Sequence, residues 1–232
     1  MSLVYNVGPY LLAAVSASVI AIYSWKRSRQ VSVITLLWAV YAIIIGQLSF
    51  FSDSDKWQSG DWVGFIFFGI LSFSPALFLV LLSKRLKKFK RFLSDTPTSA
   101  LLLTQSYRIG GIFLLMAYNR GSLPISIGLI TGVIDILVAL SAVFLALYVW
   151  NNEKKSPLLV ITWASISLLD FALAIMVFFM SFLGFADIKP APVQLGNPPL
   201  VIISLFAMPL GIFVSIYVLE RTLKWLRRSP TN

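Results

Sequence analysis

Long apolar stretches, separated by short polar connections, constrain the fold of this chain more than any other feature of its sequence. A helix needs about 20 apolar residues to cross the hydrocarbon core of a bilayer. Backbone amides find no water there, so a spanning stretch of this kind adopts a helix. We predict an all-α membrane protein, a seven-transmembrane-helix bundle with residues 1–232 forming a single transmembrane domain. The predicted spans are residues 9–25, 32–51, 62–83, 98–119, 128–150, 157–184 and 199–219.

The composition supports a lipid environment. Hydrophobic residues make up 58% of the chain and charged residues 12%, whereas about 25% of residues are charged in ordinary soluble domains. The net charge of +10 arises from basic residues at the ends of apolar stretches, where such residues anchor helices at the membrane interface. We therefore expect the lipid bilayer as the partner and no binding of nucleic acid.

The distribution of basic residues predicts the orientation. Strongly basic connections at residues 26–29, 84–91 and 153–155 alternate with neutral or acidic ones. Basic loops remain in the cytoplasm, which predicts an outer N-terminus and a cytoplasmic C-terminus in a multi-pass protein of the inner (plasma) membrane. We interpret the basic residues of 84–92 and 220–228 as cytoplasmic anchors. The alternative is that both segments form amphipathic helices on the membrane surface.

The absence of two residue types limits the chemistry. The chain contains no Cys and no His, so it offers neither a thiolate nucleophile nor an imidazole ligand for haem, zinc or copper. No G-x-S-x-G nucleophile elbow occurs,. We therefore predict no metal, no cofactor and no catalytic residue. An intramembrane enzyme built on two aspartates ranks lower among the alternatives.

Three ionisable residues lie inside predicted spans: Arg108, Asp135 and Asp170. Each costs about 2.5–3.5 kcal/mol at the bilayer centre on insertion scales. From the helix rise, they lie roughly 16, 10 and 21 Å below the outer surface, respectively. Arg108 thus falls between the two carboxylates and its long side chain can reach either one. With one cation for two carboxylates, we expect one carboxylate to carry a proton.

Polar neighbours extend this candidate site. Gln105 shares a helix face with Arg108, Tyr107 precedes Arg108, and Gln47 in the second span is expected to face inward. Paired glycines at 110–111 and a G-x-x-x-G at 128–132 indicate close helix packing,. Two interpretations stay open. The charged residues form either a functional site or a salt bridge that fixes the packing of the helices.

Three short segments carry a family resemblance. Residues 105–113 read QSYRIGGIF, residues 121–124 read GSLP and residues 132–135 read GVID. This order of Q-x-[YF]-R, G-x-L-P and G-x-x-D resembles a widespread set of uncharacterised bacterial multi-span membrane proteins, for which no activity is established. The resemblance places Arg108 and Asp135 in one motif, joined by a short outer turn, and implies that they pair.

Several functions are compatible with these features. We favour a small-solute or proton-linked transporter, or a ligand-binding membrane protein, that uses the buried Arg and Asp charges. The alternative is a non-enzymatic membrane subunit or sensor, with a membrane protein partner, in which Arg108 and Asp135 form a structural salt bridge. A rhodopsin-like protein ranks lower, because the predicted seventh span contains no Lys to bind retinal.

Overall fold

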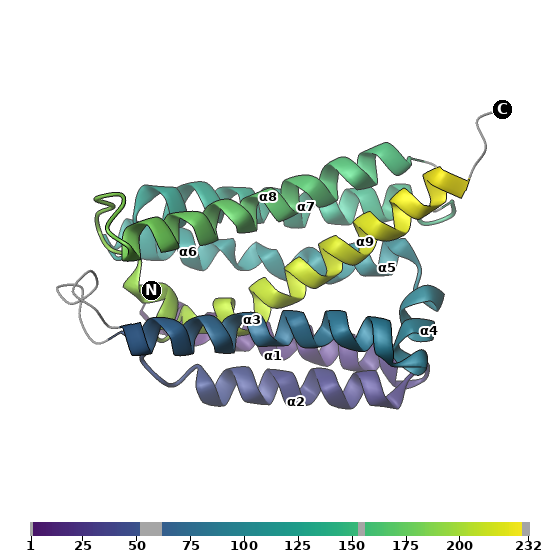
Figure 1. Cartoon of the computed structure of the whole chain (residues 1–232), viewed down its shortest axis with the longest axis horizontal. Coiled ribbons are helices and arrows are strands. Elements are labelled where there is room, and N and C mark those ends of the chain that lie inside the picture. Colours follow the sequence, from purple (N-terminus) through teal and green to yellow (C-terminus); the bar gives the residue numbers. More distant parts are fainter. Residues whose placement is uncertain (1, 52–61, 153–155, 229–232) are drawn as a thin grey trace.

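The computed structural model describes residues 2–51, 62–152 and 156–228, and within these ranges the chain is helical with no β-strand. Figure 1 shows long helices that run side by side between the two ends of the molecule. The N-terminus lies toward one end of this bundle and the C-terminus at the other (Figure 1).

Six helical segments are long and apolar enough to cross a membrane by length and composition. Large apolar side chains such as Phe144 and Leu158, 72% and 71% exposed, cover their outer surfaces, as contact with lipid requires. A multi-pass membrane protein is therefore supported. The six segments are Leu3–Trp25, Trp62–Arg85, Thr98–Asn119, Ser126–Tyr148, Pro157–Phe182 and Ile203–Arg227.

The first two helices differ from their predicted bounds. Helix α1 (Ser2–Trp25) begins seven residues before the predicted start, because membrane helices tolerate a proline such as Pro9. Helix α2 (Arg29–Ile45) has 17 residues and ends six residues early. A contact distant in sequence explains this end: Phe51 N donates to Asn197 Oδ1 at 3.1 Å, and Asn197 Nδ2 donates to Phe51 O at 2.8 Å.

Helix α3 (Trp62–Arg85) leads into the short helix α4 (Lys87–Asp95). Phe89 and Leu93 on one face of α4 are buried, whereas its basic residues are exposed. The basic segment at 84–92 is thus divided between the end of α3 and an amphipathic helix, the alternative that we ranked second. The tail at 220–228 forms no separate helix and continues α9 (Met208–Arg228).

The remaining predicted spans contain irregular turns of helix. The fourth is interrupted by a tighter 3-10 segment, and the fifth and seventh both begin with a π-helical segment. The elements are α5 (Thr98–Leu103), η2 (Thr104–Gly110), α6 (Gly111–Asn119), η3 (Ser126–Thr131), α7 (Gly132–Tyr148), α8 (Pro157–Phe182), η4 (Val193–Gly196) and η5 (Ile203–Ala207).

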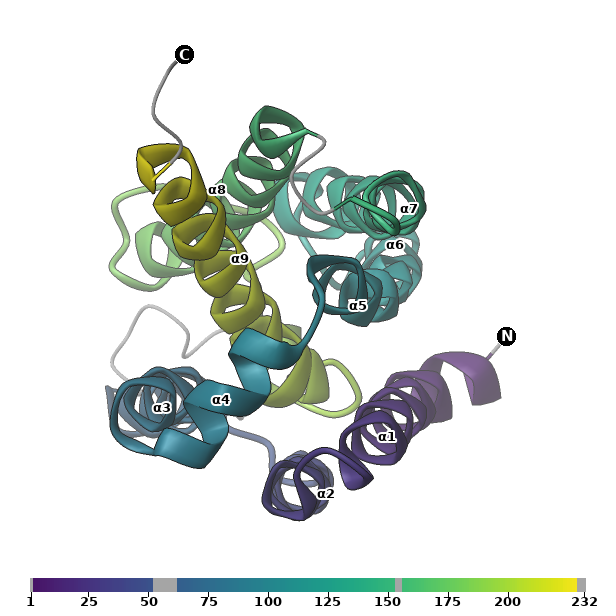
Figure 2. The same cartoon turned by 90° about the vertical axis from the view of Figure 1, so that its right-hand side faces the viewer.

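Helix α9 crosses the middle of the bundle and packs against both α8 and α3. Figure 2 shows it passing obliquely between α3 and α4 on one side and α5, α7 and α8 on the other. Helices α1 and α2 pack together, held partly by a 2.7 Å hydrogen bond between the buried hydroxyls of Ser24 and Ser32. This arrangement encloses η2 among α1, α5, α6 and α7.

Candidate functional site

Glycines bring the backbone of the fourth span close to α7. A Cβ atom on Gly111 would lie 2.7 Å from Asp135 Cβ and would also collide with the Gly132 carbonyl oxygen. A Cβ atom on Gly132 would in turn lie 3.0 Å from the Gly111 carbonyl oxygen. Only residues without a side chain permit this approach. It places Arg108, on the preceding 3-10 segment η2, directly beside Asp135 on the first turn of α7.

Arg108 is the centre of a buried polar cluster. Its Nε donates to Asp135 Oδ1 at 2.6 Å, its Nη2 donates to Asp170 Oδ2 at 2.5 Å, and its Nη1 donates to Ser167 Oγ at 2.5 Å. The guanidinium also lies 4.2 Å from the centre of the Phe171 ring. The Arg108 side chain is 1% exposed, so its guanidinium has lost its hydration. The charge-assisted hydrogen bonds to Asp135, Asp170 and Ser167 offset the free-energy cost of that loss.

The cluster joins four separate segments of the chain. Arg108 comes from η2, Asp135 from α7, and both Asp170 and Ser167 from α8. The Ser167 hydroxyl lies 2.8 Å from the hydroxyl of Ser215 on α9. The same set of bonds therefore ties the fourth, fifth, sixth and seventh predicted spans together.

The charges of this cluster do not balance if both carboxylates are ionised, since one guanidinium faces two aspartates. Asp170 Oδ1 is buried and has no hydrogen-bond partner among the described residues. The Thr131 hydroxyl is close enough to interact with the Asp170 carboxylate, but it has a 3.4 Å hydrogen bond to the Ser126 carbonyl oxygen and leaves Oδ1 without a bond of its own among the described residues. A buried, unpaired carboxylate oxygen is costly, whereas a proton on Asp170 neutralises the excess charge.

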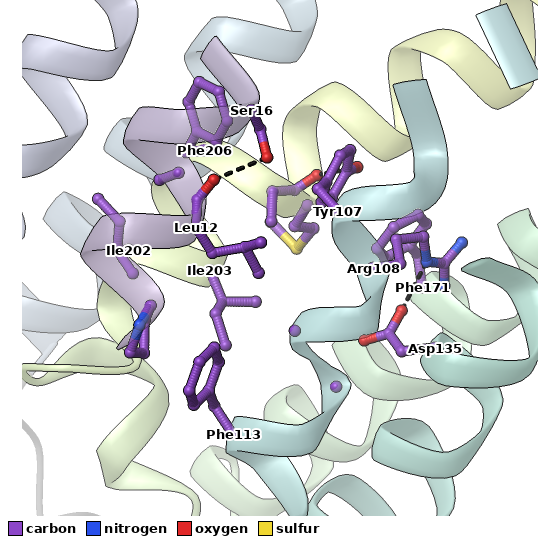
Figure 3. A pocket seen from close by; sticks show the side chains of 16 residues that line it. Leu12, Ser16, Tyr107, Arg108, Phe113, Asp135, Phe171, Ile202, Ile203 and Phe206 are labelled. Atoms are coloured by element: carbon purple, nitrogen blue, oxygen red, sulfur yellow. Dashed lines mark hydrogen bonds and ion pairs between the residues drawn. The ribbon is translucent and has the colours of Figure 1, made fainter. Parts of the chain in front are cut away.

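A cavity of about 40 Å³ borders the cluster. In Figure 3, Arg108 and Asp135 lie on one side of it, opposite Leu12 and Ile203 from α1 and η5. A buried water needs roughly 10–15 Å³ of such space and two or more polar partners. The cavity is therefore large enough for one or two waters beside Asp135,.

The other predicted site residues occupy different environments. Tyr107 lines the same cavity and donates to the Ala207 carbonyl oxygen at 2.7 Å. Gln105 is fully buried, and neither polar atom of its side chain has a partner among the described residues. Gln47 does not join the cluster: it is exposed in the turn after α2 and donates to the Ile43 carbonyl oxygen at 3.4 Å.

Two hydroxyls and a ring in the cluster were not predicted. Ser167 carries a sequence signal, because it precedes Asp170 by three residues and so shares its helix face. Phe171 and Ser215 carry none, since aromatic and hydroxyl residues are common in apolar helices. No group of three or more His, Cys, Asp or Glu side chains that could hold a metal occurs in residues 2–51, 62–152 and 156–228.

An ion-paired polar cluster enclosed by long apolar helices defines a class, that of polytopic helical membrane proteins with a charged core. The chain belongs to the family described as Domain of unknown function (DUF8737), which it matches over residues 65–223. This match includes Arg108, Asp135 and Asp170. No curated protein and no solved structure matches the chain. The family description names no activity, so a function has to be argued from the cluster.

Proposed function

We propose that this chain is a proton-linked membrane protein that transports or binds a small solute, with Asp170 as the residue that takes up and releases the proton. The observation that carries the proposal is the buried Oδ1 of Asp170, which has no hydrogen-bond partner among the described residues. Intramembrane carboxylates that are kept at an energetic cost commonly serve proton relays and coupled transport. The cavity beside Asp135 supplies space for water near the ion pairs,.

The proposal places seven spans in the inner (plasma) membrane, with the N-terminus outside and the C-terminus in the cytoplasm. Helix α2, the second along the chain, is added to the six longer segments to make seven spans, and its 17 residues cover about 25 Å at 1.5 Å per residue. An odd number of spans is supported by the opposite placement of the two chain ends in Figure 1. Basic residues in the α1–α2 turn and in α4 are predicted to face the cytoplasm.

The orientation can be tested by cysteine labelling, because the chain contains no Cys of its own. Ser94→Cys in α4 and Asn119→Cys at the end of α6 introduce single thiols at exposed positions. A membrane-impermeant maleimide added to intact cells should label the cysteine at 119 and reach the one at 94 only after the cells are opened. The reverse pattern would invert the proposed orientation.

The transport function can be tested in proteoliposomes that contain a pH-sensitive dye. A panel of small amino acids, organic cations and carboxylates is added outside wild-type, Asp170→Asn and empty vesicles. At least one solute should change the internal pH with the wild type and leave it unchanged with Asp170→Asn. Wild-type vesicles that respond like empty vesicles to every solute would argue against proton-linked transport.

A second candidate is a membrane subunit or sensor in which the cluster is a structural staple. The observation that favours it is the set of contacts made by Arg108, in which each of the three guanidinium nitrogens has a hydrogen-bond partner within the protein. Such a guanidinium is held in place by three intramolecular bonds, as a structural staple requires. This candidate predicts a membrane protein partner that co-purifies in mild detergent and is lost in harsher detergent, whereas the transporter needs none.

A further inference from the structure

The basic end of the bundle carries a surface cavity that the ion-paired cluster does not use. The cavity measures about 610 Å³ and lies between the α1–α2 turn and α4. Four cationic side chains line it, against a single carboxylate, that of Asp95. Arg91 forms a 3.6 Å ion pair with Asp95. The other three cations, Arg27, Arg29 and Lys88, have no carboxylate within ion-pair distance among the described residues.

An apolar groove begins at the same place. It measures about 780 Å³ and lies between α1 on one side and α5 with η2 on the other. Helix α1 packs against η2 and α6, but it diverges from α5 toward the basic end, where Figure 2 shows the two helices apart. Val15 and Val19, which line the groove, are 54% and 60% exposed, so the groove opens to the surrounding lipid.

Arg27 lines both the basic cavity and the apolar groove, so the two form one continuous surface. The groove extends along α1 from Arg27 to Leu12, which is about 22 Å at 1.5 Å per residue. One leaflet contributes about 15 Å of hydrocarbon to a bilayer. The groove is therefore long enough to hold an acyl chain from the interface to the bilayer centre.

Aromatic residues mark the junction as an interface. Trp150 lines the groove, as does Tyr23, whose ring lies 4.2 Å below the Arg27 guanidinium. Tyr and Trp are enriched at the level of lipid headgroups. Basic pockets beside transmembrane helices bind anionic headgroups.

We propose that this surface is a specific binding site for one anionic phospholipid, with its phosphate held by Arg27, Arg29 and Lys88 and one acyl chain lying between α1 and α5. Charge complementarity selects an anionic over a zwitterionic headgroup. The far end of the groove shares Leu12, Ser16 and Tyr107 with the cavity beside Arg108. The bound chain therefore covers the approach to the ion-paired cluster from the lipid. This inference stands independently of the proposed transport function.

Lipid binding to the full chain in detergent tests the headgroup site. Phosphatidylglycerol and phosphatidylcholine are each titrated, and bound lipid is counted by native mass spectrometry. Lys88→Gln should weaken phosphatidylglycerol binding about fivefold, which corresponds to about 1 kcal/mol for one cation near an anionic headgroup. The matched control is Lys90→Gln, which removes an equal charge from an exposed position on the same helix that does not line the cavity; it should leave binding unchanged.

A second pair of variants tests the groove. Ala100→Trp places a large ring in the groove and should reduce phosphatidylglycerol binding, whereas Ala172→Trp on the exposed face of α8 should not. Glycerol 3-phosphate supplies the headgroup without the chain and should not compete at equal concentration. Equal binding of both lipids, equal effects of the two Lys variants, or full competition by glycerol 3-phosphate would each overturn the proposal.

Discussion

Replacing Arg108 with Met removes the cation that two buried carboxylates share. The Arg108 and Asp170 side chains are each 1% exposed and that of Asp135 is 10% exposed. Removing one partner of a buried ion pair typically costs 3–5 kcal/mol, because it leaves an uncompensated buried charge. We therefore expect Arg108→Met to lower the free energy of unfolding by about 3–5 kcal/mol.

Removal of the carboxylates together with Arg108 should rescue stability. Arg108→Met combined with Asp135→Asn and Asp170→Asn removes all three ionisable groups and replaces each with a side chain of similar size. Because a whole ion-pair network can be replaced at little cost, the triple variant should recover about 2 kcal/mol of the loss, with the remainder due to unpaired amides. Unfolding by sodium dodecyl sulfate in mixed micelles gives the free energies.

An exposed charge provides the control. Arg85→Met removes a guanidinium from the exposed end of α3 and should change stability by less than about 0.5 kcal/mol. The reasoning would be refuted if Arg108→Met unfolded like Arg85→Met. It would also be refuted if the triple variant were no more stable than the single one, since the loss would then come from packing and not from stranded charge.

Two further predictions concern the contacts that position the cluster. Gly111→Ala should lower the free energy of unfolding by about 1–3 kcal/mol through overpacking, because the added methyl would lie 2.7 Å from Asp135 Cβ; Gly69→Ala is the matched control, since its Cβ meets nothing within 4 Å, and it should be neutral or stabilise by up to about 1 kcal/mol. Ser167→Ala should lower the free energy of unfolding by about 1–3 kcal/mol, because it leaves Arg108 Nη1 unpaired. An unchanged midpoint in the same dodecyl sulfate titration would contradict this prediction.

Much of the helical arrangement could be predicted from hydropathy, because a bilayer accepts few structures other than apolar helices. The proximity of Arg108, Asp135 and Asp170 could also be predicted, since groups that are costly to bury alone are expected to pair. The glycines at 110–111 and 132 pointed to the close approach that the structure has between Gly111 and Gly132.

The remaining features depend on contacts between distant residues, which periodicity does not reveal. The end of α2 is set by bonds between Phe51 and Asn197, 146 residues apart. The 3-10 segment around Arg108 has no compositional signal, and the inward position expected for Gln47 was wrong because α2 ends before it. Ser215 joins the cluster through tertiary packing alone.

The most direct test of the account is the pH dependence of stability in the wild type and in Asp170→Asn. The charged groups that face Asp170 are Arg108 and Asp135, from two other segments. The folded cluster is proposed to hold one proton that the unfolded chain releases at neutral pH. The folded state then binds more protons than the unfolded state, so stability must fall as pH rises.

The predicted slope is at most about −1.4 kcal/mol per pH unit over the pH range where the folded cluster holds its proton and the unfolded chain does not, and it should flatten once the cluster also loses that proton. The chain contains no His, so no imidazole titrates in this range to obscure it. The wild type should show this slope and Asp170→Asn should be nearly flat, because its amide cannot bind the proton. Parallel curves for the two proteins would contradict the account and leave the cluster as a structural staple without a stored proton.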